Sequence, residues 1–292
     1  MIRTLWVTGA LLCLGGPAWG QGPPGTNLTV DVAVQRIQLR GDTVAMQYSV
    51  RNSPRSAEDL WSFTVEAPSP PLHVSLPQPA EDWMTAVLMQ GLPVARWVTL
   101  GNHVRRGAGT PDLSFAAVGL PGMVDYWAGG YFPVPDYEPV DEDTLRAVTP
   151  RQALAANAVV GQTVGVEPFP TDLSPGNLLA RLRVLTDSAC SLGWIQGRGT
   201  CHELDEHLDQ AGRELQRGRR EDAREHLREF LGDLRVRAGR RSEDDVEGHG
   251  WREDRDERQT AVNSSAYWLL VVNAEYLLRH LCEPGERCQE DH

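Results

Sequence analysis

The sequence predicts an α+β protein with two segregated domains, an N-terminal antiparallel β-sandwich and a C-terminal four-helix bundle. Three observations support this prediction. From Asn27 to about Val166, apolar residues alternate with a period of two in short runs separated by Gly and Pro. After Pro170 the apolar spacing changes to three and four residues, which is the period of a helix. The length of 292 residues and the hydrophobic content of 41% are sufficient for two packed domains.

The first strands are the most clearly defined. Residues 28–34 alternate between apolar and polar side chains, and the phase shifts at Ile37, which predicts a β-bulge near residues 35–36. Residues 41–42 are typical of a hairpin tip. The proline-rich segment 67–79 is expected to be an extended edge or a connection. Further short strands are predicted at 44–50, 61–65, 96–100 and 113–118. Such a set favours an immunoglobulin-like sandwich.

Four helices are predicted after residue 170. Ser174 suits an N-cap, and Pro175 suits the first position of a helix. The last helix, from about residue 261 to 281, is apolar nearly all round between Tyr267 and Val272, so it should be central to the bundle. The mixed-charge stretch at about 240–258 is expected to be a mobile loop. In the first three helices the apolar positions are Leu178, Leu182, Leu185, Ala189, Leu192, Leu204, Leu208, Ala211, Leu215, Ala223, Leu227, Phe230, Leu231 and Leu234.

The N-terminus has the pattern of a signal peptide. It contains a positive charge, a short apolar stretch over residues 5–14, and small residues at Ala18 and Gly20. We therefore expect residues 1–20 to be removed on export to an extracellular or periplasmic space. The sandwich domain is then predicted at residues 21–170 and the helical domain at residues 171–292.

The mature chain keeps four cysteines, and an even number in an exported protein indicates disulfides. Pairing Cys190 with Cys201 and Cys282 with Cys288 is favoured, because each pair is close in sequence near predicted helix ends. Two other connectivities stay open. A zinc site is the alternative, but neither pair has the spacing of a zinc knuckle.

Charge and composition exclude several partners. The net charge of −12 argues against nucleic-acid binding, which needs clustered cations. Asn273 and Glu275 interrupt the apolar run of the last helix, which argues against a membrane span once the leader is removed. All 28 basic residues are arginine, a bias typical of a GC-rich bacterial genome. The chain therefore has no Schiff-base lysine, no phosphate-loop lysine and no Ser-Lys dyad, and we expect no cofactor.

No catalytic or metal-binding motif emerges from the sequence. His202 and His207 are five residues apart, which places them about 140° apart around a helix and disfavours a shared metal ion. His226 and His280 stand alone on other helices. The sequence also has no nucleophile elbow, no dinucleotide-binding loop and no phosphate loop.

The aromatic residues of the N-terminal half are the best candidates for a binding surface. Trp61 and Trp97 lie within apolar alternations and are interpreted as core. A second group falls among Gly and Pro in a region, 119–144, that is rich in loop signals. Exposed rings on a β-sandwich can stack on sugar rings. The candidate binding residues are Tyr126, Trp127, Tyr131, Phe132 and Tyr137.

The helical half resembles the FIMAH-type helical domain. The resemblance rests on residues 178–195, residues 204–215, Gly218, the run from Ala223 to Leu231, and the late apolar helix. Modules of this kind are found at the C-terminal ends of secreted bacterial proteins. The resemblance implies a surface-associated or accessory module, and it transfers no catalytic residues.

Taken together, these features predict an exported, non-enzymatic binding or surface-associated module whose partner is a polysaccharide or an envelope protein. One alternative is a structural spacer or docking protein without a ligand site. The other is a carbohydrate hydrolase or lyase that uses two carboxylates, because such residues meet in space and not in sequence.

Overall fold

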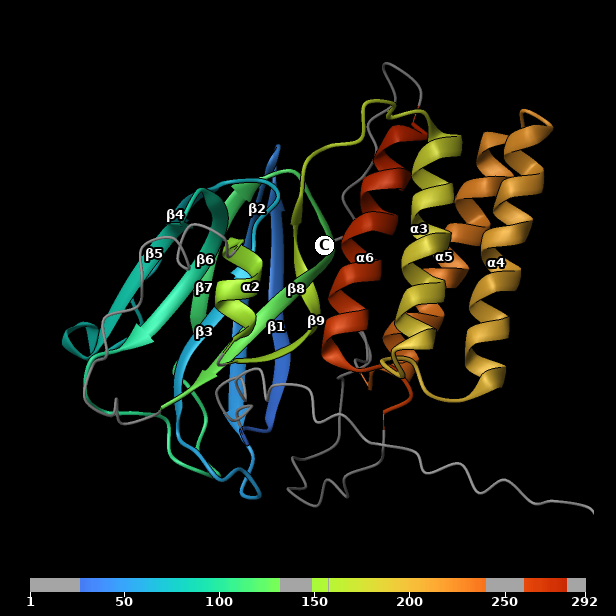
Figure 1. Ribbon diagram of the computed structural model, residues 1–292. Coiled ribbons are helices and arrows are strands. Elements are labelled where there is room, and N and C mark those ends of the chain that lie inside the picture. Colours follow the sequence, from blue (N-terminus) through green and yellow to red (C-terminus); the bar gives the residue numbers. More distant parts are fainter. Residues whose placement is uncertain (1–26, 132–148, 157, 240–259, 283–292) are drawn as a thin grey trace, which may run out of the picture.

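The computed structural model describes residues 27–131, 149–156, 158–239 and 260–282 (Figure 1). The predicted signal peptide (1–20) and the predicted mobile loop (240–258) lie outside these residues.

Two antiparallel sheets form the sandwich, as predicted. The first has the order β1-β2-β7-β4 and the second the order β5-β6-β3-β8-β9. With β1 as strand A, these orders match the ABED and CFG sheets of an immunoglobulin-like domain, with β5 and β6 added beside strand C. The strands are β1 (Val30–Arg40), β2 (Thr43–Asn52), β3 (Leu60–Glu66), β4 (Pro71–Val74), β5 (Trp83–Met89), β6 (Leu92–Thr99), β7 (Leu113–Val118), β8 (Leu120–Gly130) and β9 (Ala158–Glu167).

Aromatic rings fill the space between the two sheets. Tyr48 of β2 packs against Phe63, Trp97 and Phe115 with ring centroids 6.1–6.3 Å apart. Its hydroxyl donates a hydrogen bond to the Val164 carbonyl at 2.7 Å, and burial raises the pKa of this phenol well above its usual value. The prediction that Trp97 belongs to the core is confirmed, since its side chain is fully buried.

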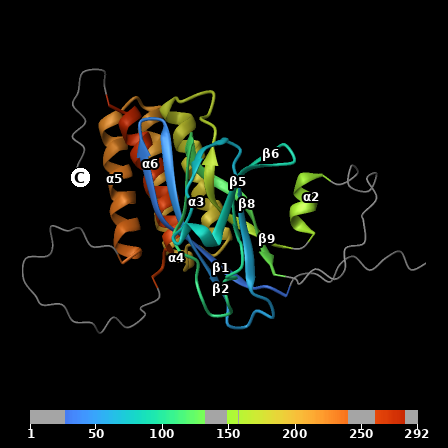
Figure 2. The ribbon, with the colours of Figure 1, turned by 90° about the vertical axis from the view of Figure 1, so that its left-hand side faces the viewer.

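Four long helices follow the sandwich, as predicted, and all lie on one side of it (Figures 1 and 2). Each buries most of the apolar stripe expected from its sequence, but Leu192 is 41% exposed because it lies at the C-cap, past the last turn of its helix. A short helix that was not predicted, α2 (Pro150–Ala155), stands apart from them and precedes β9. The long helices are α3 (Pro175–Ser191), α4 (Arg198–Gln216), α5 (Arg220–Arg237) and α6 (Ser264–His280). Within the described part of the chain, no helix has both the length and the apolar composition needed to cross a bilayer.

Helix α6 lies between the sandwich and the other helices, and it docks at the β-bulge of β1. The strand register shifts between Val34 and Arg36, which confirms the predicted bulge and leaves Gln35 outside the ladder. The Val34 amide donates to Ser265 Oγ at 3.1 Å, and Trp268 Nε1 donates to the Gln35 carbonyl at 2.6 Å. Helix α6 is apolar nearly all round, and it can therefore bury side chains against both the sheets and the other helices.

A second set of polar contacts fixes α3 and α6 to the start of β8. Asn273 Nδ2 of α6 donates to the Pro121 carbonyl at 3.0 Å, and Arg181 of α3 donates to the same carbonyl at 2.8 Å. Arg181 also pairs with Glu167 at 2.7 Å. The buried apolar side chains of the sheets and helices form one continuous cluster. The strand half and the helical half therefore share a single core.

The disulfide between Cys190 and Cys201 confirms the first predicted pairing. It links the end of α3 to the first turn of α4, on either side of a connection between the two helices. Cys282 also takes part in a disulfide. Cys288 lies outside the described residues, so its pairing with Cys282 stays a prediction.

Candidate functional site

Two of the five candidate aromatic residues do not lie in a loop. Tyr126 and Trp127 belong to β8, which pairs with β3 on one side and β9 on the other. Trp127 is only 3% exposed. The Tyr126 ring packs 5.7 Å from Phe63, and burial followed by the charge of Asp31 raises its pKa. The interpretation of this stretch as a loop was therefore wrong.

A glycine of this stretch is needed for packing between strands, since at Gly119 a Cβ atom would lie 2.0 Å from the Glu167 carbonyl oxygen of β9. At Gly161 of β9 a Cβ atom would lie 2.6 Å from the Tyr126 ring. Glycine at this position leaves room for the aromatic ring on the neighbouring strand.

Tyr131 directly follows β8 and is exposed at one end of the sandwich. Its side chain is 42% exposed, and its ring stacks on His103 with centroids 3.8 Å apart. The Tyr131 amide donates to the Asp59 carbonyl at 2.7 Å, which ties the residue to the start of β3. Phe132 and Tyr137 lie outside the described residues.

Trp61 lies at the same end of the sandwich and is 38% exposed, so its interpretation as core was wrong. The physical reason is a register irregularity between Leu60 and Ser62, which places Trp61 outside the regular pairing with β8. The Trp61 carbonyl accepts a hydrogen bond from Thr99 Oγ1 at 3.3 Å, and the same hydroxyl lies 2.9 Å from His103 Nδ1. We call Trp61, His103 and Tyr131 the aromatic end.

One polar pair lies next to the aromatic end. Asn102 precedes His103 and is exposed, and its Nδ2 donates to Asp82 Oδ1 at 3.1 Å. A carboxamide and a carboxylate beside exposed rings are the kinds of groups that orient sugar hydroxyls.

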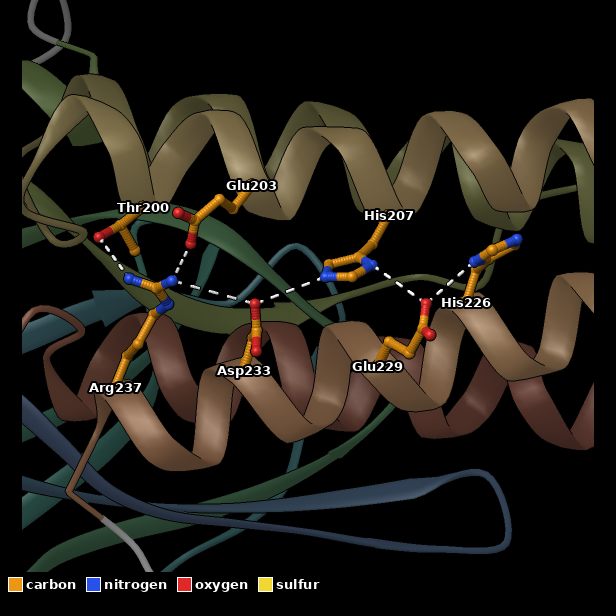
Figure 3. Close-up of polar contacts among 7 residues, drawn as sticks. All are labelled: Thr200, Glu203, His207, His226, Glu229, Asp233 and Arg237. Atoms are coloured by element: carbon orange, nitrogen blue, oxygen red, sulfur yellow. Dashed lines mark hydrogen bonds and ion pairs between the residues drawn. The ribbon is translucent and has the colours of Figure 1, made fainter.

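A second polar cluster, which we call the α4–α5 ladder, joins the two outer helices (Figure 3). Arg237 of α5 donates to Thr200 Oγ1 at 3.0 Å and forms an ion pair with Glu203. Asp233 Oδ2 lies 4.0 Å from Arg237 and 3.4 Å from His207 Nε2. The ladder consists of Thr200, Glu203, His207, His226, Glu229, Asp233 and Arg237.

Two histidines meet at one end of this ladder. Glu229 Oε2 lies 3.4 Å from His207 Nδ1 and 3.0 Å from His226 Nδ1. His202, by contrast, contacts Glu206 at 3.4 Å on the exposed side of α4. His207 thus faces a histidine on the next helix, a pairing that a search along one helix cannot find.

The sequence does contain a signal for this meeting. Gly218, with φ 74°, forms the turn between α4 and α5. His207 and Glu229 lie equally far from Gly218 along the chain. In an antiparallel helical hairpin, residues equidistant from the turn lie at the same level. Counting from Gly218 therefore places His207 opposite Glu229.

Two surface hollows lie beside α3. The first, of about 360 Å³, is next to the sandwich and is lined by Glu167, which pairs with Arg181. The second, of about 550 Å³, lies between α3 and α4, and no carboxylate is among the described residues that line it. A glycosidase needs two facing carboxylates about 5–10 Å apart. Neither hollow provides such a pair.

Part of the helical half matches a known family model, over most of α3 and all of α4 and α5. Residues 179–246 match the FIMAH domain, which confirms the resemblance of the helical half. No curated protein sequence matches the chain.

Two solved structures overlap the chain at low similarity. A GH20 exo-β-N-acetylglucosaminidase from Vibrio harveyi is 12% identical, with a TM-score of 0.25, over 52% of this chain and 22% of that one. A protein from Nocardia farcinica, described as having an immunoglobulin-like fold, is 13% identical, with a TM-score of 0.24, over 48% of this chain and 97% of that one. The fold assignment above follows from the strand order alone.

Proposed function

We propose that the chain is an exported, non-enzymatic binding module that contacts polysaccharide through the aromatic end. The observation that carries the proposal is the exposure of Tyr131 and Trp61, at 42% and 38%, in a half of the molecule whose other large rings are mostly buried. Exposing a ring leaves apolar surface in water, and stacking on the apolar face of a sugar ring removes that surface.

The surroundings of these rings support the proposal. The His103 imidazole stacks against the Tyr131 ring, and the hydrogen bond from the Tyr131 amide to the Asp59 carbonyl ties its backbone to the start of β3. A ring held in this way loses little conformational freedom when a ligand binds. Asn102 and Asp82 add polar groups at the same end.

Export is part of the proposal. It is supported by the leader pattern, by the disulfide between Cys190 and Cys201, and by the FIMAH match within the helical half. Neither of the two hollows favours the hydrolase alternative. The spacer alternative predicts that no ligand binds to the aromatic end.

The experiment is a glycan array with the full chain, followed by titration of each retained glycan. Tyr131→Ala and Trp61→Ala should each weaken binding about tenfold, equivalent to about 1.4 kcal/mol, whereas Tyr131→Phe, which keeps the ring, should bind like the wild type. Val236→Ala is the matched control, because Val236 is a highly exposed apolar residue on α5. The spacer alternative would be favoured if the wild type retained no glycan, or if both alanine variants retained glycan as strongly as the wild type does.

A further inference from the structure

We propose that His207, His226 and Glu229 form a binding site for one transition-metal ion of the Zn²⁺ class. The ligand atoms of the three side chains lie within 4.8 Å of one another. Two imidazoles and one carboxylate are a donor set that proteins use for zinc, with a fourth position left open for water or another ligand. The site is separate from the aromatic end and does not depend on the function proposed for it.

The distances already approach those of a metal site. Ligand atoms about 2.1 Å from a tetrahedral ion are about 3.4 Å from each other. Glu229 Oε2 lies 3.4 Å from His207 Nδ1 and 3.0 Å from His226 Nδ1, so two sides of the ligand triangle need little adjustment. The ligand nitrogens of the two imidazoles lie no more than 4.8 Å apart, so the third side of the triangle has to close by at most about 1.4 Å.

One atom of the site lacks a hydrogen-bond partner. His207 Nδ1 is inaccessible to solvent and makes no hydrogen bond, although it faces Glu229 Oε2. A buried polar nitrogen without a partner loses hydration without compensation. An ion between His207, His226 and Glu229 would give this nitrogen a ligand bond.

The other nitrogen of His207 is positioned for metal binding at Nδ1. Asp233 Oδ2 lies 3.4 Å from Nε2 and favours a proton on that atom, which leaves the Nδ1 lone pair free. Asp233 is itself next to Arg237, which is held by Thr200 and Glu203 (Figure 3). The rest of the ladder therefore orients the histidine.

The site is accessible and selects for the type of ion. His207 and His226 are half-buried, and Glu229 is exposed, so an ion can reach the site from solvent. Two imidazole ligands favour Zn²⁺, Ni²⁺ or Cu²⁺ over Ca²⁺ and Mg²⁺, which prefer oxygen. Because the ligands come from both α4 and α5, the ion would join the outer helices and stabilise the folded state by mass action.

The test is isothermal titration of the full chain with Zn²⁺, using protein purified without a polyhistidine tag. The wild type should bind one ion, and its Tm should rise with Zn²⁺. His207→Gln and His226→Gln should each lower the affinity by more than about a hundredfold, and Asp233→Asn by about tenfold. These side chains are at the surface of the bundle, and circular dichroism checks that each variant is folded.

His202→Gln is the matched control, because His202 is on the same helix, is 74% exposed and contacts a carboxylate. It should bind Zn²⁺ like the wild type. Absence of one-to-one binding in the wild type, unchanged binding in His226→Gln, or loss of binding in His202→Gln would each overturn the proposal. Glycan retention plays no part in this readout, so the metal-site proposal and the glycan-binding proposal can be contradicted independently of each other.

Discussion

The inner helices α3 and α6 and the outer helices α4 and α5 are held in place by different kinds of contact. Helix α6 packs on the sandwich, and α3 is joined to it through Arg181. Two of the polar contacts are buried, the Val34 amide on Ser265 and Asn273 on the Pro121 carbonyl. The outer pair buries one apolar face, and a row of partly exposed charged groups joins the two helices. Both pairs contribute to the same core.

The difference shows where this fold can accommodate functional groups. A buried donor or acceptor that loses its partner costs about 1–3 kcal/mol, so the inner contacts fix the orientation of the helices against the sheets. An exposed ion pair contributes only about 0–1 kcal/mol, so the outer ladder can change with little effect on the fold. The outer helices are thus the part of the bundle in which histidines and carboxylates can gather for binding.

Leu270→Ala tests whether the two halves form one folding unit. Leu270 of α6 is fully buried, so the substitution should lower the free energy of unfolding by about 2–5 kcal/mol. Because α6 contributes to the shared core, peptides from β2 and α4 should both lose protection against hydrogen exchange. Mass spectrometry measures the two peptides separately.

The same measurement tests the domain division predicted at residue 170. Faster exchange in α4 with unchanged exchange in β2 would mean that the sandwich folds independently, as the sequence predicted. Val236→Ala, at a highly exposed position of α5, should leave both peptides unchanged.

Local patterns in the sequence were sufficient for much of the fold. The phase shift at Ile37 located the β1 bulge, the three-and-four spacing located α3, α4 and α5, and the apolar run located α6. What the bulge does was not predictable, because Ser265 and Trp268, which contact it, lie at the other end of the chain. The glycines in and next to β8 were interpreted as turn residues, because glycine is typical both of turns and of places where two strands pack closely.

The candidate sites were less predictable than the fold. Alternation placed Trp61 in the core, but an irregularity in the pairing of β3 leaves it exposed. Helix periodicity relates His207 only to His202 on its own helix, whereas its neighbours are on α5. Both errors have the same physical cause: contacts between elements depend on register and turns, and periodicity within one element does not report them.

Asn273→Ala should have the next largest effect, because it removes the hydrogen bond that joins the middle of α6 to β8. Its amide donates to the Pro121 and Leu269 carbonyls in a buried setting, and we expect a loss of about 1–3 kcal/mol in the free energy of unfolding. Denaturant titration measures it. Asn177→Ala is the control at the exposed start of α3, where the loss should be below about 1 kcal/mol. Equal losses in the two variants would contradict a special role for the inner contacts.

The smallest expected effect compares one ion pair from each region. Glu203→Gln removes the charge that faces Arg237 in the ladder, and Glu167→Gln removes the charge that faces Arg181 beside the sandwich. The ladder pair is the more exposed, so Glu203→Gln should cost less than about 1 kcal/mol, and added salt should reduce that cost. Glu167→Gln should cost about 1 kcal/mol more and depend less on salt, because the inner pair is better shielded from water. Denaturant titrations at low and high salt measure both quantities. The same salt dependence in the two variants would mean that the inner ion pair is no better shielded from water than the outer one.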